Sequence, residues 1–236
     1  MIESKNKNVY VENWGKQRYI HAWNKQEKLL ESIIRIKKQN RSTKKRIETP
    51  NYLIFLEHQP VYTLGKSGDI HNLLIDKSIL SEKDVDFVKS NRGGDITFHG
   101  PGQLVVYPIL DLENFFTDIH LYLRKLEDVI IQTLNDFGIK GQRSPGETGV
   151  WLGIGTPFAR KICAMGIRAS RWVTMHGFAL NINTDLSYFD NIIPCGIKGK
   201  GVTSMQKEIG DQIFFEKVIL KIKLNFENIF EAKLVD

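Results

Sequence analysis

Residues 92–110, RGGDITFHGPGQLVVYPIL, hold two strand-like runs separated by a short turn. The runs cover residues 96–99 and 104–110, and Gly100-Pro101-Gly102 lies between them. Glycine and proline favour a tight turn here, because glycine reaches backbone angles closed to other residues and proline fixes its own φ. The stretch therefore predicts two strands joined by a turn, with Arg92-Gly93-Gly94 leading into the first.

Further elements are predicted on both sides of this stretch. Short apolar runs typical of strands occur at residues 52–56, 85–88, 150–154, 161–168 and 172–183. Apolar residues recur every three or four positions, as in helices, around residues 20–34, 119–137 and 211–230. Strands and helices in this order predict an α+β fold with a mainly antiparallel or mixed sheet, and we expect one domain over residues 1–236.

Composition and charge narrow the function classes. The 236 residues include 33 Lys and Arg against 27 Asp and Glu, a formal charge of +6, and 42% are hydrophobic. This composition is typical of a globular protein long enough to bury a core. Residues 1–50 hold 13 basic and 5 acidic residues, a net of +8, which leaves −2 for residues 51–236. A nucleic-acid-binding protein is therefore disfavoured, and we interpret the basic run at 37–46 as a helix end followed by a solvated connector.

The two cysteines, Cys163 and Cys195, are too few for a disulfide scaffold and lack zinc-site spacing. No H-E-x-x-H or similar pattern is present, so we predict no metal. The N-terminus opens polar, and the longest apolar run is far shorter than the roughly 20 residues of a membrane span. We expect an unprocessed cytoplasmic protein.

Cys195 and Lys161 are the candidates for covalent chemistry. Cys195 lies between Pro194 and Gly196, a turn that presents a side chain, although a small residue filling a turn is the alternative. Lys161 begins an otherwise apolar strand, so it either reaches solvent from the strand end or, held beside Cys195, accepts the thiol proton. Cys163 is a rival nucleophile because positions 161 and 163 share a face of a regular strand, but its apolar neighbours indicate inert packing.

Glycine-containing clusters at residues 92–103, 161–179 and 194–205 are candidate substrate sites. Each is either a set of hairpin turns or a place where a substrate approaches backbone N–H groups. His99 and His176 each precede a glycine, and a lone histidine is more often structural than catalytic.

In their order along the chain, RGGDITFHGPGQLVVYP, KICAMGIR and HGFALNINTDLSYFDNIIPCG resemble the octanoyltransferases of lipoate biosynthesis over about residues 50–205. The resemblance implies the lipoyl/biotin protein ligase fold. It also implies transfer of an octanoyl or lipoyl group from acyl carrier protein to a lysine of a lipoyl-carrying domain, as the first step of endogenous protein lipoylation.

The same resemblance assigns roles to residues. Cys195 matches the cysteine that carries the acyl thioester, and Lys161 matches the lysine that activates it. The segments that match substrate-binding positions are Arg92, Gly93, Gly94, Asp95, Ile96, Thr97, Phe98 and His99, then Ala164, Met165 and Gly166, then Gly177, Phe178 and Ala179. Phe98 departs from the family, which commonly has tyrosine there.

The resemblance implies no cofactor and no membrane or nucleic-acid partner. The implied donor is acyl carrier protein, and the implied acceptors are lipoyl domains of 2-oxoacid dehydrogenases and the glycine cleavage H protein. Residues 151–200 hold 6 basic and 2 acidic residues, which suits such acidic partners. Alternatives are an ATP-dependent lipoate or biotin ligase of the same fold, a cysteine thioesterase and a nucleic-acid-binding module.

Overall fold

The computed structural model describes residues 5–43, 46–194 and 201–235. Its strands are β1 (Asn8–Gln17), β2 (Tyr52–His58), β3 (Val61–Leu64), β4 (Asp86–Lys89), β5 (Ile96–His99), β6 (Gln103–Ile109), β7 (Gln142–Ser144), β8 (Glu147–Leu152), β9 (Arg160–Ser170), β10 (Val173–Asn181), β11 (Gly201–Val202) and β12 (Lys233–Val235). Its helices are α1 (Tyr19–Ser42), α2 (Lys77–Glu82), α3 (Ile119–Asn135), α4 (Met205–Ile209) and α5 (Phe215–Phe230). Short 3₁₀ turns are η1 (Ile70–Asn72), η2 (Leu112–Asn114) and η3 (Leu186–Asn191).

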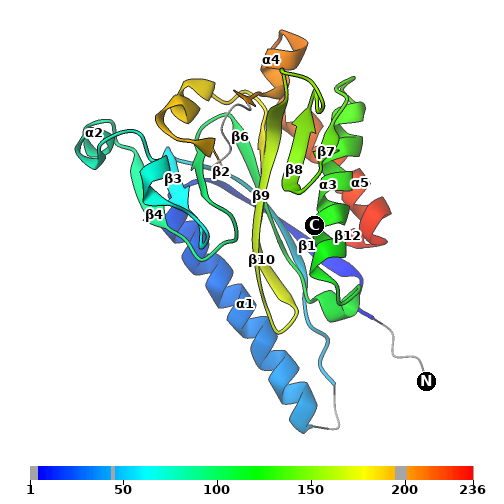
Figure 1. Cartoon of the computed structure of the whole chain (residues 1–236). Coiled ribbons are helices and arrows are strands. Elements are labelled where there is room, and N and C mark those ends of the chain that lie inside the picture. Colours follow the sequence, from blue (N-terminus) through cyan, green and yellow to red (C-terminus); the bar gives the residue numbers. More distant parts are fainter. Residues whose placement is uncertain (1–4, 44–45, 195–200, 236) are drawn as a thin grey trace.

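The strands form two sheets, a large one and a small one (Figure 1). The large sheet has the order β12-β1-β2-β6-β10-β9-β8-β7, and β11 pairs with β9 beside this path. β1 runs parallel to β2 and β12, and β11 runs parallel to β9, whereas the other pairs of this sheet are antiparallel. The small sheet, β4-β3-β5, is also mixed. The predicted α+β class with mixed sheets is therefore confirmed.

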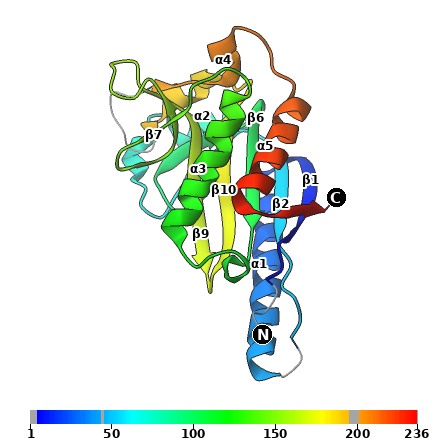
Figure 2. The ribbon, with the colours of Figure 1, turned by 90° about the vertical axis from the view of Figure 1, so that its right-hand side faces the viewer.

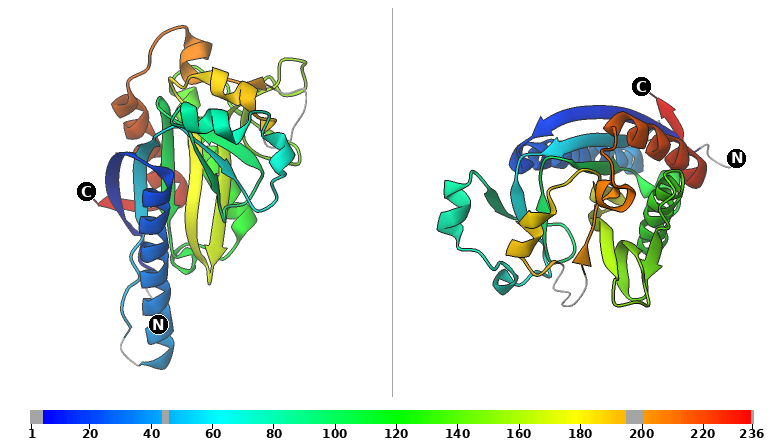
Figure 3. Two further views of the ribbon diagram at one scale, coloured as in Figure 1. Left: turned by 90° about the vertical axis from the view of Figure 1, so that its left-hand side faces the viewer. Right: turned by 90° about the horizontal axis from the view of Figure 1, so that it is seen from above.

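Helices cover both faces of the large sheet. Along β2, Leu53 and Phe55 join a core formed with α3 and α5, whereas Ile54 and Leu56 join a core formed with α1. Figure 2 shows α3 and α5 in front of the sheet, and the left panel of Figure 3, seen from the opposite side, shows α1. Because both faces are buried, β2 reads as one continuous apolar run instead of alternating apolar and polar residues.

Local sequence explains where α3 begins and which face it buries. The Asp118 side chain accepts a hydrogen bond from the Leu121 N–H at 2.9 Å, which satisfies one of the free donors of the first turn. Leu126, Val129 and Ile130 recur at helical spacing and are fully buried. Burial of each such side chain contributes about 1.5–3 kcal/mol, so packing against the sheet determines the position of this helix.

The small sheet places the loop at residues 92–95 directly on β9. The Gly93 N–H donates to the Ile167 carbonyl at 2.9 Å. A Cβ added at Gly166 would lie 2.7 Å from the Gly93 oxygen, a distance that real Cβ atoms do not reach. Glycine at position 166 is therefore required for this close approach of two backbones.

Most predicted elements are present, with three kinds of difference. The strands β1, β3, β7, β11 and β12 and the short helices α2 and α4 were not predicted, and residues 172–183 begin as a hairpin turn with positive φ at Arg171 and Trp172. The interpretation of residues 37–46 as a solvated connector is wrong at Lys37, which lies on α1, is buried and forms an ion pair with Asp111.

Among the described helices, none combines the length and the apolar character that crossing a membrane requires.

Candidate active site

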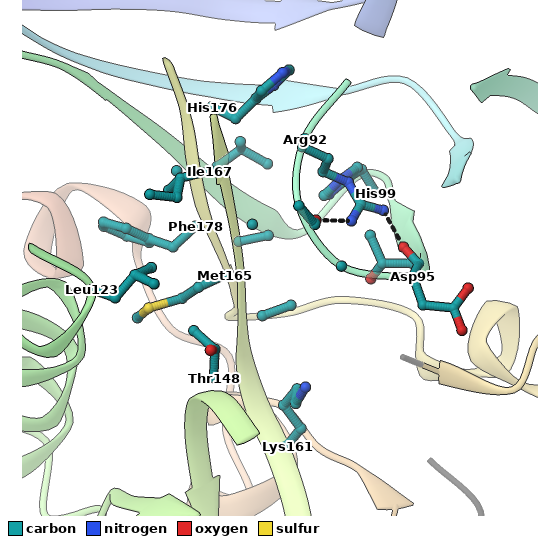
Figure 4. Close-up of a pocket in the computed structure, with 18 of the residues that line it drawn as sticks. Arg92, Asp95, His99, Leu123, Thr148, Lys161, Met165, Ile167, His176 and Phe178 are labelled. Atoms are coloured by element: carbon teal, nitrogen blue, oxygen red, sulfur yellow. Dashed lines mark hydrogen bonds between the residues drawn. The ribbon is translucent and has the colours of Figure 1, made fainter. Parts of the chain in front are cut away.

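A cavity of about 430 Å³ lies between the loop at residues 92–95 and the strands β9 and β10 (Figure 4). Most of the predicted substrate-binding residues line it, and they come from three separate segments of the chain. These are Arg92, Gly93, Gly94, Asp95, Thr97, His99, Ala164, Met165, Gly166, Gly177, Phe178 and Ala179, together with Lys161. The three sequence clusters thus converge on one pocket of the size that small-molecule sites have.

Two of the predicted residues do not line this cavity. Strand alternation on β5 directs Thr97 and His99 toward the cavity, whereas Ile96 and Phe98 pack into the core of the small sheet. The Phe98 ring stacks on the Tyr188 ring with centroids 4.4 Å apart. Ile96 and Phe98 therefore support the cavity wall from behind.

Arg92 holds the shape of the loop from inside. Its guanidinium donates to the Thr63 carbonyl at 2.6 Å, to the Gly93 carbonyl at 2.9 Å and to the Asp95 carbonyl at 2.8 Å. The side chain is buried, so these charge-assisted hydrogen bonds are shielded from solvent. Figure 4 shows the guanidinium folded back onto its own loop, which fixes the backbone of residues 93–95 against β9.

Lys161 lines the cavity because β9 carries an extra residue beside it. Val150 pairs with Cys163, but the next residue on β8, Trp151, pairs with Lys161, so Ile162 is a β-bulge. The bulge puts Lys161 on the cavity side and leaves Cys163 in the apolar core, so the expectation that positions 161 and 163 share a face is wrong. The Lys161 ammonium lies 4.5 Å from the centre of the Trp151 ring, a cation–π distance.

Cys195 lies outside the described residues, but both described ends of its segment lie beside Lys161. Pro194 and Lys161 line the same small side cavity. On the other side, Val202 pairs with Lys161, and the Thr203 N–H donates to the Lys161 carbonyl at 3.0 Å. The chain therefore leaves and re-enters the described structure next to the candidate base.

Cys163 is in an environment that opposes reactivity. It is fully buried in the apolar core, and burial raises the pKa of its thiol well above the ordinary value despite the nearby Lys161 charge. Because the thiolate is the reactive form, a thiol held neutral in this way is inert. The interpretation of Cys163 as packing agrees with this position.

Sequence reasoning missed one wall of the cavity and its apolar side. Leu123 and Ile167 contribute apolar surface beside Met165 and Phe178. The other lining residues outside the predicted segments are Tyr19, Val105, Tyr107, Gly146, Glu147, Thr148 and His176. Val105 and Tyr107 lie in the strand-like run predicted at residues 104–110, but no sequence signal indicates which of the two covered sheet faces borders a cavity.

Three histidines lie in or behind the inner cavity wall, and all three are neutral. Burial lowers the pKa of His58 to about 4 and that of His176 to about 3, and it lowers the pKa of His99 well below the ordinary value. The His58 ring accepts from the Tyr107 hydroxyl at 2.6 Å through Nε2, because its Nδ1 faces the Gln17 carbonyl. These three side chains therefore add no charge to the wall, where Arg92 supplies a positive charge.

No three histidine, cysteine or carboxylate side chains converge as metal ligands within residues 5–43, 46–194 and 201–235. The site combines an apolar wall, a glycine-containing loop, and a buried lysine beside Pro194 and Val202, the described residues on either side of the cysteine-bearing segment. This arrangement suits an acyl chain whose reacting end lies near Lys161.

Comparison with known proteins agrees with this geometry. The model of the lipoyl protein ligase A/B catalytic domain matches residues 12–227. The octanoyltransferase of Christiangramia forsetii is 60% identical, with 97% of this chain and 98% of the relative covered. The octanoyltransferase of Flavobacterium psychrophilum is 59% identical, with 98% and 100% covered.

Solved structures show the same fold at low sequence identity. A lipoate-protein ligase A structure with bound ATP has a TM-score of 0.67 at 12% identity, covering 97% of this chain and 90% of that one. The bipartite lipoate protein ligase of Thermoplasma acidophilum has a TM-score of 0.63 at 15% identity, covering 99% and 88%. From the family model and the near-full-length relatives, the chain belongs to the lipoyl protein ligase A/B catalytic domain family and, within it, to the octanoyltransferases.

Proposed function

We propose that this octanoyltransferase moves the acyl group from acyl carrier protein to Cys195 and then to a lysine amine of a lipoyl-carrying domain. The observation that carries the proposal is the position of Lys161. It lines the acyl-sized cavity, and the described residues on both sides of Cys195, Pro194 and Val202, lie beside it. A thioester exchange requires a base beside the thiol, and this is the role proposed for Lys161.

In the first half-reaction, Lys161 accepts the thiol proton of Cys195, and the thiolate attacks the carbonyl carbon of the acyl-carrier thioester. The new carbon–sulfur bond forms as the bond to the carrier sulfur breaks, and the carrier thiolate takes up the proton. The acyl group moves between two sulfurs of similar leaving ability, so the exchange needs no ATP. Backbone N–H groups of the glycine-containing segments that are not already bonded within the fold, as that of Gly93 is, are proposed to hold the developing oxyanion.

In the second half-reaction, the acceptor lysine attacks the Cys195 thioester as a neutral amine. With an ordinary pKa near 10.4, only about 1 in 2,500 lysines is neutral at pH 7, so a base is needed. Lys161 is proposed to remove the amine proton and to return a proton to the departing Cys195 sulfur. The change from thioester to amide is downhill and drives the transfer.

The apolar wall supplies the binding energy for the chain. Leu123, Met165, Ile167 and Phe178 line the cavity along β9, β10 and α3. Each methylene moved from water onto such a surface contributes about 0.8 kcal/mol, so a chain of several methylenes is held firmly without any polar contact. This surface supports an alkyl substrate over a polar one.

A mixture of purified enzyme, octanoyl-acyl carrier protein and a lipoyl domain without ATP tests the proposal. We expect one octanoyl group on the acceptor lysine with wild type and with Cys163→Ala, and none with Cys195→Ala. An ATP requirement together with an active Cys195→Ala would instead identify an ATP-dependent ligase. Release of free octanoate at a rate comparable to transfer would identify a thioesterase.

A further inference from the structure

The register of β9 and β10 orders the cavity from its reacting end inward. Ala179 pairs with Ala164, Phe178 with Met165, Gly177 with Gly166, and His176 with Ile167. The first pair lies at the reacting end, because Ala164 and Ala179 also line the side cavity that contains Lys161 and Pro194. Figure 4 shows Lys161 and His176 at opposite ends, with the apolar side chains between them.

His176 is held at this inner end by an unusual backbone conformation. Its φ is +58°, in the left-handed region that non-glycine residues rarely adopt. Its N–H donates to the Gln26 side-chain oxygen at 2.8 Å on α1. A strained conformation that persists at a cavity wall indicates a functional demand on the side chain.

The hydrogen bonds of the imidazole define which of its nitrogens carries the proton. Asn91 donates through its Nδ2 to Glu27 at 2.8 Å, so its oxygen is the atom that faces His176 Nε2 at 2.7 Å. Nε2 is therefore the protonated nitrogen, and Nδ1 is an acceptor. Nδ1 is buried and has no hydrogen-bond donor among the described residues.

The distance between the two ends of the cavity along β9 matches the length of an eight-carbon acyl chain. Three steps along β9, from Ala164 to Ile167, span about 10 Å. An extended octanoyl chain has seven carbon–carbon bonds and spans about 8–9 Å at the rise per bond of an extended backbone. An acyl carbonyl at the Ala164–Ala179 pair therefore brings the eighth carbon to the level of His176.

We infer that His176 closes the inner end of the acyl cavity and limits the chain to about eight carbons, which makes it a specificity-determining residue of the proposed transfer. A longer chain would have to displace an imidazole that is fixed at its backbone N–H and at Nε2. The inference rests on the proposed function for the position of the reacting end.

The test compares wild type with variants in single-turnover acylation. Octanoyl-, decanoyl- and dodecanoyl-acyl carrier protein are supplied separately, and the enzyme adduct is followed by intact-mass spectrometry. His176→Gly fits the left-handed backbone and removes the ring, and His176→Asn keeps a residue type that tolerates this conformation. Ile167→Ala opens the same end from β9. Arg171→Gly, at φ +52° on the exposed β9–β10 turn, is the control for a backbone effect.

Wild type is expected to favour octanoyl over decanoyl by at least about tenfold, the discrimination that apolar pockets achieve for added methylenes. The two His176 variants and Ile167→Ala are expected to lower this ratio about tenfold, whereas Arg171→Gly keeps it. If the wild type is octanoylated and the variants keep its ratio of octanoyl to decanoyl acylation, the assignment of His176 is refuted and the proposed function is not. A wild type that takes octanoyl and decanoyl equally would also refute that assignment. A wild type acylated by no carrier would refute the proposed function, and the chain-length assignment would fall with it.

Discussion

Acidification from pH 7 to pH 5 should destabilise this protein through its three buried histidines. His58, His99 and His176 are neutral in the fold because burial lowers their pKa values, to about 4 for His58 and about 3 for His176. In the unfolded chain the ordinary histidine pKa is about 6.5, so the unfolded state binds more protons throughout this window. The stabilisation is therefore present above pH 6.5 and is lost as the pH falls toward the folded-state values.

The magnitude follows from the two protonation equilibria. Between pH 7 and pH 5, protonation of the unfolded imidazole favours unfolding by about 2 kcal/mol per histidine, and the folded-state pKa values of about 4 for His58 and about 3 for His176 offset almost none of it. These two histidines together lower the free energy of unfolding by about 4 kcal/mol, a large part of the 5–15 kcal/mol typical of a domain, and His99 acts in the same direction. Carboxylates remain mostly ionised in this range, so they contribute little.

Urea unfolding at pH 7, 6 and 5 measures this loss. His58→Gln, whose amide can replace both hydrogen bonds of the ring, should reduce the loss by about 2 kcal/mol, whatever its stability at pH 7. His21→Gln, on the exposed side of α1, is the matched control and should keep the wild-type slope. A wild-type loss below about 1 kcal/mol, or a His58→Gln variant with the full wild-type loss, would show that these imidazoles are not held neutral by burial.

Two further changes test the catalytic end and the loop support. Lys161→Ala should slow enzyme acylation by about 10²–10⁴-fold, the range for loss of a general base, with unfolding unchanged in denaturant titration. The exposed Lys207→Ala should keep the wild-type rate, and equal rates in the two variants would remove Lys161 from the mechanism. Gly166→Ala forces a Cβ to within 2.7 Å of the Gly93 oxygen, so it should lower the melting temperature and raise KM for the octanoyl carrier. Gly201→Ala, whose Cβ meets nothing closer than 3.6 Å, should change neither, and a Gly166→Ala variant as stable as Gly201→Ala would contradict the proposed contact.

Several elements were predictable because each has a local signal. The spacing of apolar residues on α3 and α5 and the glycine–proline turn before β6 led to elements close to those observed. By contrast, β1 mixes polar and apolar residues and contains Gly15 at φ +61°, so its parallel pairing with β2 and β12, and not a local pattern, makes it a strand.

The sequence predicted which three segments form the candidate site, but not how their side chains are oriented within it. Motif order brought the glycine-containing loop, β9 and β10 into one site, and strand alternation separated His99 from Phe98 within the same segment. The bulge at Ile162 reverses the face expected for Lys161 relative to Cys163, and no local residue signals it. Tyr19 lines the cavity from α1, far from every motif, because its position depends on how that helix packs on the sheet.

Intact-mass spectrometry of the enzyme after mixing with octanoyl-acyl carrier protein, without an acceptor and without ATP, tests the central claim most directly. Wild type and Cys163→Ala should each carry one octanoyl adduct, and peptide mapping should place it on Cys195. Cys195→Ala should carry no adduct, and Lys161→Ala should form one slowly. An adduct of the same size on Cys195→Ala, or none on a wild type that still octanoylates a lipoyl domain, would contradict transfer through a Cys195 thioester.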